Sequence, residues 1–169
     1  SGKAQVDTLA GFTVSSTCGT IGQMHARDTN ALVSWLKGKR FQSLTRRDND
    51  WLFAFDEDTH LTVECLWRLI ENGRMKRTSE DHGQWFGLPR PVDASAEVNR
   101  HIANQRVSDV KLRAGTLDLE LHFESEVVLQ VIPDSAGYEA WVVRCPIGEF
   151  IAMGGGGLEY RANSPPKGE

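Results

Sequence analysis

Apolar and polar residues alternate in short segments along most of the chain, and polar turns separate these segments. Trp51, Phe53 and Phe55 recur at every second position, and the same period continues in Leu61–Cys65. A period of two places side chains on one face of a β-strand, whereas a helix repeats every 3.6 residues. The segments follow one another through short turns, so we expect a mostly antiparallel meander of strands.

Two segments have helical spacing instead. Leu32 and Leu36 lie on one face of the range Thr29–Gly38, where Asp28 or Thr29 can cap the first turn and glycine fits the end. A second helix is predicted over Ser95–Ala103. The fold class predicted from these patterns is α+β.

The order of these segments repeats after 66 residues. Ser95 follows Thr29 at this offset, and the helix and three strands recur with their turns and without a gap. We therefore predict two pseudo-repeats of helix plus antiparallel strand meander, related by a pseudo-twofold axis, in one compact domain. The inward face is predicted to hold Phe41, Leu44, Trp51, Phe53, Phe55 and Val63, with their equivalents Val107, Val110, Leu117, Leu119, Leu121 and Leu129.

Further strand boundaries follow from alternation and from turn residues. The third strand is expected to continue over Leu61–Glu71. Asn72-Gly73 then predicts a tight hairpin, because both residues tolerate positive φ, and Met75–Ser79 is the expected return strand. Tyr138–Arg144 alternates like a strand, and Gly154–Gly157 is expected to form a bend before a last edge strand.

The segment between the repeats, Glu80–Asp93, is termed the connector. Its glycines and prolines exclude a regular element, whereas Trp85 and Phe86 are too apolar for a solvated linker. We expect both aromatic side chains to be buried, one against each repeat, since burial of such a side chain is worth roughly 1.5–3 kcal/mol. On this hypothesis Trp85→Ala lowers thermal stability, and His82→Ala has little effect. Exposure of Trp85 would instead indicate a recognition loop.

These segments give a complete prediction of the domain organisation. Met24 stands immediately before the first helix signal, so residues 1–24 are interpreted as a poorly ordered leader or an artificial extension. A short native strand through Gly11–Val14 is the alternative. A single domain is predicted over residues 25–162, comprising pseudo-repeat 1 (28–79), the connector (80–93) and pseudo-repeat 2 (94–162), followed by a flexible tail (163–169).

Composition narrows the class of protein. The 169 residues are 40% hydrophobic and 25% charged, as in an ordinary globular domain, and the net charge of −4 gives no support for binding to nucleic acid. The apolar runs are too short to span a bilayer. Three scattered cysteines argue against a disulfide framework, so we expect a cytoplasmic protein without membrane association.

No motif in the sequence points to catalysis. Glu80-Asp81-His82 is the densest cluster of titratable groups, but neighbouring residues rarely chelate one ion, and an ordering turn explains them better. Gly154–Gly157 lacks the lysine of a phosphate-binding loop. We therefore predict no catalytic residue, metal or cofactor.

Trp and Arg are enriched at interface hot spots, which adds three residues to the candidate binding set. That set is Trp67, Arg68, Glu80, Asp81, His82 and Trp85.

The range Leu66–Asp93 and the ending with GYEAWVV and GGGGLEY resemble small bacterial proteins of unknown function. They are also similar in style to immunity proteins of polymorphic toxin systems, in which a Glu-x-Trp strand and a Gly-rich segment close the chain. Here these are Glu139-Ala140-Trp141 and Gly154–Gly157. The resemblance covers the last two-thirds of the chain and implies no catalytic residue.

The sequence and the resemblance together favour a non-enzymatic binding protein of immunity type, acting as a monomer or homodimer. Its partner would be a protein, with a cognate toxin as one candidate. Acidic turns at Asp48–Asp50, Asp56–Asp58 and Glu124–Glu126 would attract a basic partner. The alternative is a small-molecule-binding protein or enzyme with a cleft between the repeats, which a pocket holding Arg68, Asp81 and His82 would favour.

Overall fold

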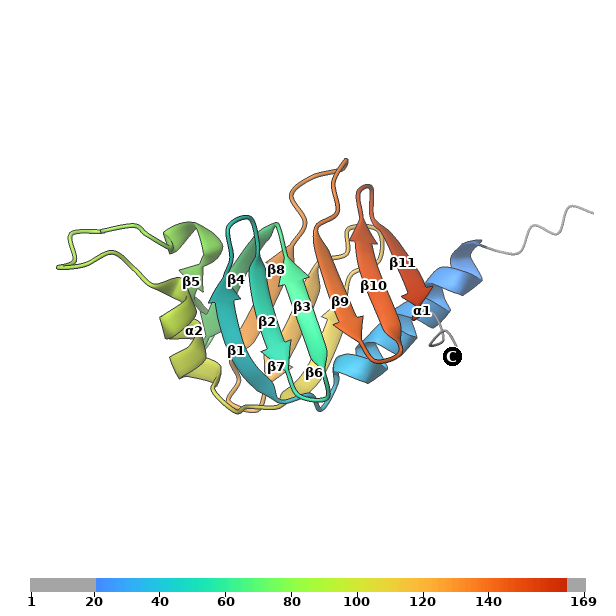
Figure 1. Cartoon of the computed structure of the whole chain (residues 1–169), viewed down its shortest axis with the longest axis horizontal. Coiled ribbons are helices and arrows are strands. Elements are labelled where there is room, and N and C mark those ends of the chain that lie inside the picture. Colours follow the sequence, from blue (N-terminus) through green and yellow to red (C-terminus); the bar gives the residue numbers. More distant parts are fainter. Residues whose placement is uncertain (1–20, 164–169) are drawn as a thin grey trace, which may run out of the picture.

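The chain forms two antiparallel β-sheets that pack face to face, with one helix at each open side (Figure 1). A computed structural model describes residues 21–163, with side chains from residue 26 onward. The α+β fold class is therefore confirmed, with strands as the dominant element. The helices are α1 (Ile21–Leu36), α2 (Ala94–Ile102) and the short 3-10 helix η1 (Ser79–Asp81).

One sheet has six strands in the order β1-β2-β3-β9-β10-β11, and the other has five in the order β5-β4-β8-β7-β6. The first contains β1 (Phe41–Arg46), β2 (Trp51–Phe55), β3 (Thr59–Val63), β9 (Trp141–Cys145), β10 (Gly148–Met153) and β11 (Gly157–Ala162). The second contains β4 (Leu66–Glu71), β5 (Arg74–Thr78), β6 (Val107–Leu112), β7 (Leu119–Phe123) and β8 (Val128–Ile132). Each sheet thus combines strands from both halves of the chain.

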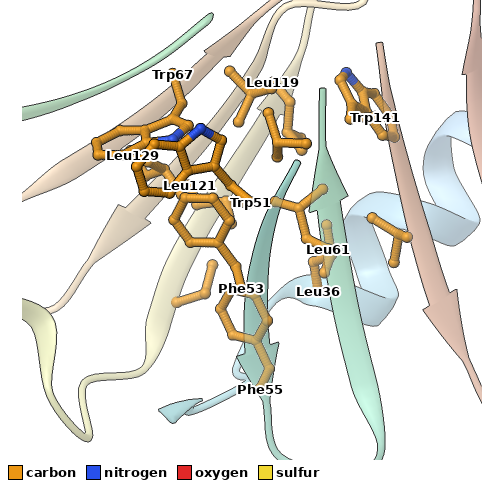
Figure 2. Close-up of a cluster of buried hydrophobic side chains, with 14 of the residues drawn as sticks. Leu36, Trp51, Phe53, Phe55, Leu61, Trp67, Leu119, Leu121, Leu129 and Trp141 are labelled. Atoms are coloured by element: carbon orange, nitrogen blue, oxygen red, sulfur yellow. The ribbon is translucent and has the colours of Figure 1, made fainter. Parts of the chain in front are cut away.

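The predicted inward face is confirmed. All twelve of its residues are buried, and the sheets meet through aromatic contacts such as Trp51 with Trp67, whose ring centroids lie 5.0 Å apart (Figure 2). Phe41 of β1 likewise meets Phe123 of β7 at 6.3 Å. The alternation of the sequence thus faces each sheet toward the other, as in a β-sandwich.

Each helix covers one open side of the sandwich, where it packs on the first strand of the other half of the chain. α1 contacts β6 and β11, and α2 contacts β1 and β5. On α2, the side chain of Asn99 accepts a hydrogen bond from the Leu44 amide at 2.6 Å and donates one to the Leu44 carbonyl at 3.1 Å. Asn99 therefore satisfies backbone groups at the outer edge of β1, which would otherwise lack a strand partner.

The two linkers that follow the helices run side by side in opposite directions. Arg40 and Arg106 form an isolated antiparallel bridge there. The Arg40 guanidinium donates to the Asn104 carbonyl at 2.7 Å, and that of Arg106 donates to the Gly38 carbonyl at 2.8 Å. Gly38 and Asn104 both adopt positive φ, at 85° and 58°, which turns the chain sharply out of each helix.

Several predicted boundaries are wrong. The first helix begins at Ile21, before the expected cap at Asp28 or Thr29, so Met24 lies inside α1. The third strand ends at Val63 instead of reaching Glu71, because the chain crosses to the other sheet before Leu66. This crossing places Trp67 opposite Trp51 and buries it completely, which one continuous strand could not achieve.

The later strands are closer to their predictions. Asn72-Gly73 forms the expected hairpin between β4 and β5, with φ of 52° and 70°. The strand expected over Tyr138–Arg144 begins only at Trp141, and Tyr138 is 79% exposed. The possible strand Gly11–Val14 and most of the tail at 163–169 lie outside the described residues. Within residues 21–163, no helix is both long and apolar enough to cross a bilayer.

Candidate functional site

The connector is the most exposed apolar segment of the described chain. Trp85 is 57% exposed, Phe86 64% and Leu88 48%, so the predicted burial of the two aromatic residues is wrong. Figure 1 shows this loop projecting from the body beside α2. The physical reason is that the inward apolar faces of the two sheets cover each other, so neither face is left for the aromatic residues of the connector to cover. Exposed apolar side chains gathered on one loop are typical of an interaction site.

The connector nevertheless has a defined backbone. At its base, the Gly83 amide donates to the Val92 carbonyl at 2.9 Å, and the Val92 amide donates to the Gln84 carbonyl at 2.8 Å. At its tip, the Leu88 amide donates to the Trp85 carbonyl at 2.7 Å. The loop is therefore closed like a hairpin, and its aromatic side chains are presented from a fixed base.

The acidic-histidine cluster forms that base, in agreement with the predicted ordering turn. Asp81 accepts a hydrogen bond from the Thr78 amide at 2.9 Å and lies 3.7 Å from the Arg77 guanidinium. His82 accepts from the Ala94 amide through Nδ1 at 3.2 Å, and its ring packs edge-on against Trp51. These contacts use the side chains to join η1, the connector and α2.

The other predicted site residues are separated from this cluster. Trp67 is fully buried in the core, so its assignment to a binding surface is wrong. Arg68 lies on the outer face of the five-stranded sheet, where it donates to Gln130. The cavity of about 180 Å³ that Arg68 lines includes neither Asp81 nor His82. The arrangement that would favour a small-molecule site between the halves is therefore not supported by this cavity.

A polar network covers the outer face of the five-stranded sheet. Gln130, which accepts from Arg68, donates to Glu120 at 2.7 Å, and Glu120 also lies 3.0 Å from His122 Nε2. Partial burial acts to raise the pKa of Glu120, but the hydrogen bonds from His122 and Gln130 outweigh it and leave this pKa below its usual value. The network is thus a set of mutually satisfied groups, and Arg68, Gln130 and Glu120 of this network also line the cavity of about 180 Å³.

We expect Glu120→Gln to lower the free energy of unfolding by less than about 1 kcal/mol at pH 7, since the pair is partly exposed. Because the folded-state pKa of Glu120 is lowered, its carboxylate stabilises the fold at pH values above the unfolded-state pKa of about 4.3. This stabilisation disappears as the pH falls through the folded-state pKa. Urea unfolding at pH 7 and pH 3 measures the difference. A gap between wild type and variant that does not narrow as the pH falls would contradict this assignment.

Neither described cysteine is suited to catalysis. Burial raises the pKa of Cys65 to about 12 and also raises the pKa of Cys145. A thiol with a raised pKa carries little of the nucleophilic thiolate at neutral pH. Among the residues that the structure describes, no group of three or more His, Cys, Asp or Glu side chains could hold a metal ion.

A groove lies between the connector and α2, and sequence reasoning missed it. Its volume is about 470 Å³, and Leu88, Pro91, Ala96, Arg90 and Arg100 are among the residues that line it. The prolines that follow the apolar range Trp85–Leu88 make its burial less favourable, so an exposed loop could have been predicted there. Arg90 and Arg100 gave no such signal, because only the fold brings the loop beside the exposed face of α2.

Comparisons with protein-family models, with curated proteins and with solved structures found no match.

Proposed function

We propose that this protein is a binding protein that engages a protein partner through the tip of the connector. The observation that carries the proposal is the exposure of Trp85, Phe86 and Leu88 together on one hydrogen-bonded loop. Such side chains are costly to leave in water, and aromatic residues dominate the binding energy of many interfaces. Because the base of the loop is fixed, the connector loses less conformational entropy when a partner binds.

An immunity-type role is the form of this function that we propose, with a toxin as the partner. The resemblance of Leu66–Asp93 and of the chain's ending to immunity proteins supports it, and that range contains the exposed tip. Asp56–Asp58 and Glu124–Glu126 form turns at the end of the sandwich away from the connector (Figure 1). These turns would attract a basic surface of the partner at a distance, whereas the connector would contact a different part of the partner.

Co-purification with the product of the neighbouring gene tests this function. Trp85→Ser combined with Phe86→Ser is expected to weaken binding by at least about tenfold, because interface aromatics often contribute more than 1.4 kcal/mol each. The variant should keep the wild-type melting temperature, since both side chains are exposed.

Tyr138→Ser provides a matched control, because Tyr138 is an even more exposed aromatic residue on another loop. This control is expected to bind like the wild type and to protect cells equally against the partner's toxicity. If the connector variant binds and protects as well as the wild type does, the connector is not the contact surface.

We also propose that residues 28–79 and 94–162 form an internal repeat. Three observations support this: the matching order of helix and strands, the reciprocal hydrogen bonds of Arg40 and Arg106, and the equivalent burial of the two inward faces. The halves would exchange their later strands, because β4 and β5 join the second half's sheet and β9 and β10 join the first half's. Superposing residues 29–64 on 95–130 tests the proposal, and a different path of the chain in the two ranges would refute it.

A further inference from the structure

The groove beside the connector is lined by both apolar and charged side chains. Its apolar lining comes from Leu88 and Pro91 on the connector and from Ala96 on α2. Its volume of about 470 Å³ falls within the range of ligand pockets, roughly 300–1,000 Å³. One wall is a helix face and the other is the hydrogen-bonded loop, so both sides of the groove have a defined position.

Charge distinguishes this groove from a simple apolar depression. Arg90 and Arg100 both line it, and neither has a carboxylate partner within residues 26–163. The two acidic residues that line it are already engaged: Glu97 binds Arg77 at 2.6 Å, and Asp93 accepts the Ala96 amide at 3.0 Å as the cap of α2. The groove therefore presents two guanidinium groups that form no salt bridge with any residue of the described range 26–163.

We infer that the groove binds an acidic, extended segment of the protein partner. This inference rests on the proposed function, which it refines by naming the chemistry of the partner's docking segment. Carboxylates of the segment accept hydrogen bonds from Arg90 and Arg100, in the bidentate geometry that guanidinium groups favour. Apolar side chains between these carboxylates pack against Leu88 and Pro91, beside the exposed Trp85.

A second copy of this chain is a poor occupant of the groove. A self-association through the same surface would bring Arg90 and Arg100 of both copies into one interface, and like charges brought together in an interface are costly. An acidic segment from another protein has the opposite effect, since it supplies carboxylates to two arginines that have none as partners among residues 26–163.

Selection of random linear peptides on immobilised protein tests the inference without knowledge of the partner. Peptides selected on the wild type are expected to be enriched in Asp and Glu next to Leu, Ile or Val. Their affinity should fall by about tenfold or more on Arg90→Glu combined with Arg100→Glu, because the carboxylates would then meet like charges. Arg74→Glu is the matched control, since Arg74 is an exposed arginine of β5 that does not line the groove.

The remaining outcomes separate the inference from the proposed function. Selected peptides that need Trp85 and Phe86 but show no acidic enrichment would overturn the inference and leave connector binding intact. Acidic peptides that Arg74→Glu weakens as strongly as the groove variant would show general charge attraction and would also overturn it. Failure to select any peptide would overturn the docking of a linear segment, and co-purification with the neighbouring gene product would still decide the proposed function.

Discussion

Trp67→Ala is expected to lower the free energy of unfolding by about 3–5 kcal/mol, the usual cost of removing a buried Trp or Phe side chain. Trp67 is fully buried and contacts both Trp51 and Phe53 of the opposite sheet, at centroid distances of 5.0 and 5.9 Å (Figure 2). Its removal would leave a cavity between the two sheets, where neither can move inward without distorting its strands. Urea unfolding at neutral pH measures this loss.

Two controls make the Trp67 result specific. Trp67→Phe should cost less, because it keeps an aromatic ring and loses an indole Nε1 that has no hydrogen-bond partner among the described residues. Trp85→Ala should leave the unfolding midpoint nearly unchanged, since Trp85 is 57% exposed. If Trp85→Ala instead destabilised the protein as much as Trp67→Ala, the connector would pack on the core after all.

Gly156→Ala is the second substitution for which we expect a large effect. A methyl group at this position would overlap the carbonyl oxygen of Gly115 in the neighbouring loop, and Gly156 has φ of 86°. Overpacking typically costs about 1–3 kcal/mol, and a left-handed backbone adds about 1–2 kcal/mol for a residue other than glycine. The two loops would have to separate, which should appear as a lower melting temperature.

Gly155→Ala isolates the conformational part of this cost. Gly155 has nearly the same φ, 82°, but a methyl group there would come no closer than 3.9 Å to its nearest neighbour, the Ala136 carbonyl oxygen. Its destabilisation should therefore be limited to the left-handed backbone, about 1–2 kcal/mol. Equal losses for the two substitutions would show that the contact between Gly156 and Gly115 does not constrain the fold.

The sequence predicted local structure better than the path of the chain between sheets. Alternation identified the inward residues correctly, because the period of two is imposed by the strand backbone itself. It could not show that the chain leaves one sheet after Val63, since Leu66–Glu71 continues the same alternation in the other sheet. Alternation describes the faces of a strand and carries no information about which sheet that strand joins.

The candidate site was predicted only in part, for a related reason. The prediction that Asp81 and His82 order the connector is confirmed, because Asp81 accepts the nearby Thr78 amide and His82 accepts the amide of Ala94, the first residue of α2. Local hydrogen bonds do not indicate the exposure of Trp85, and only the prolines that follow it in the connector favoured an exposed loop. Burial depends on whether another surface is free to cover a residue, and here the two sheets cover each other.

The mixing of strands from both halves in each sheet has a consequence for folding during synthesis. β1, β2 and β3 emerge first, but β3 stays at an open edge until β9 at Trp141–Cys145 pairs with it. β4 likewise waits for β8. Contacts this distant in sequence slow folding, because a long loop must close before they form. We therefore expect the first half to leave the ribosome with exposed strand edges, and the native fold to form only once nearly the whole chain is available.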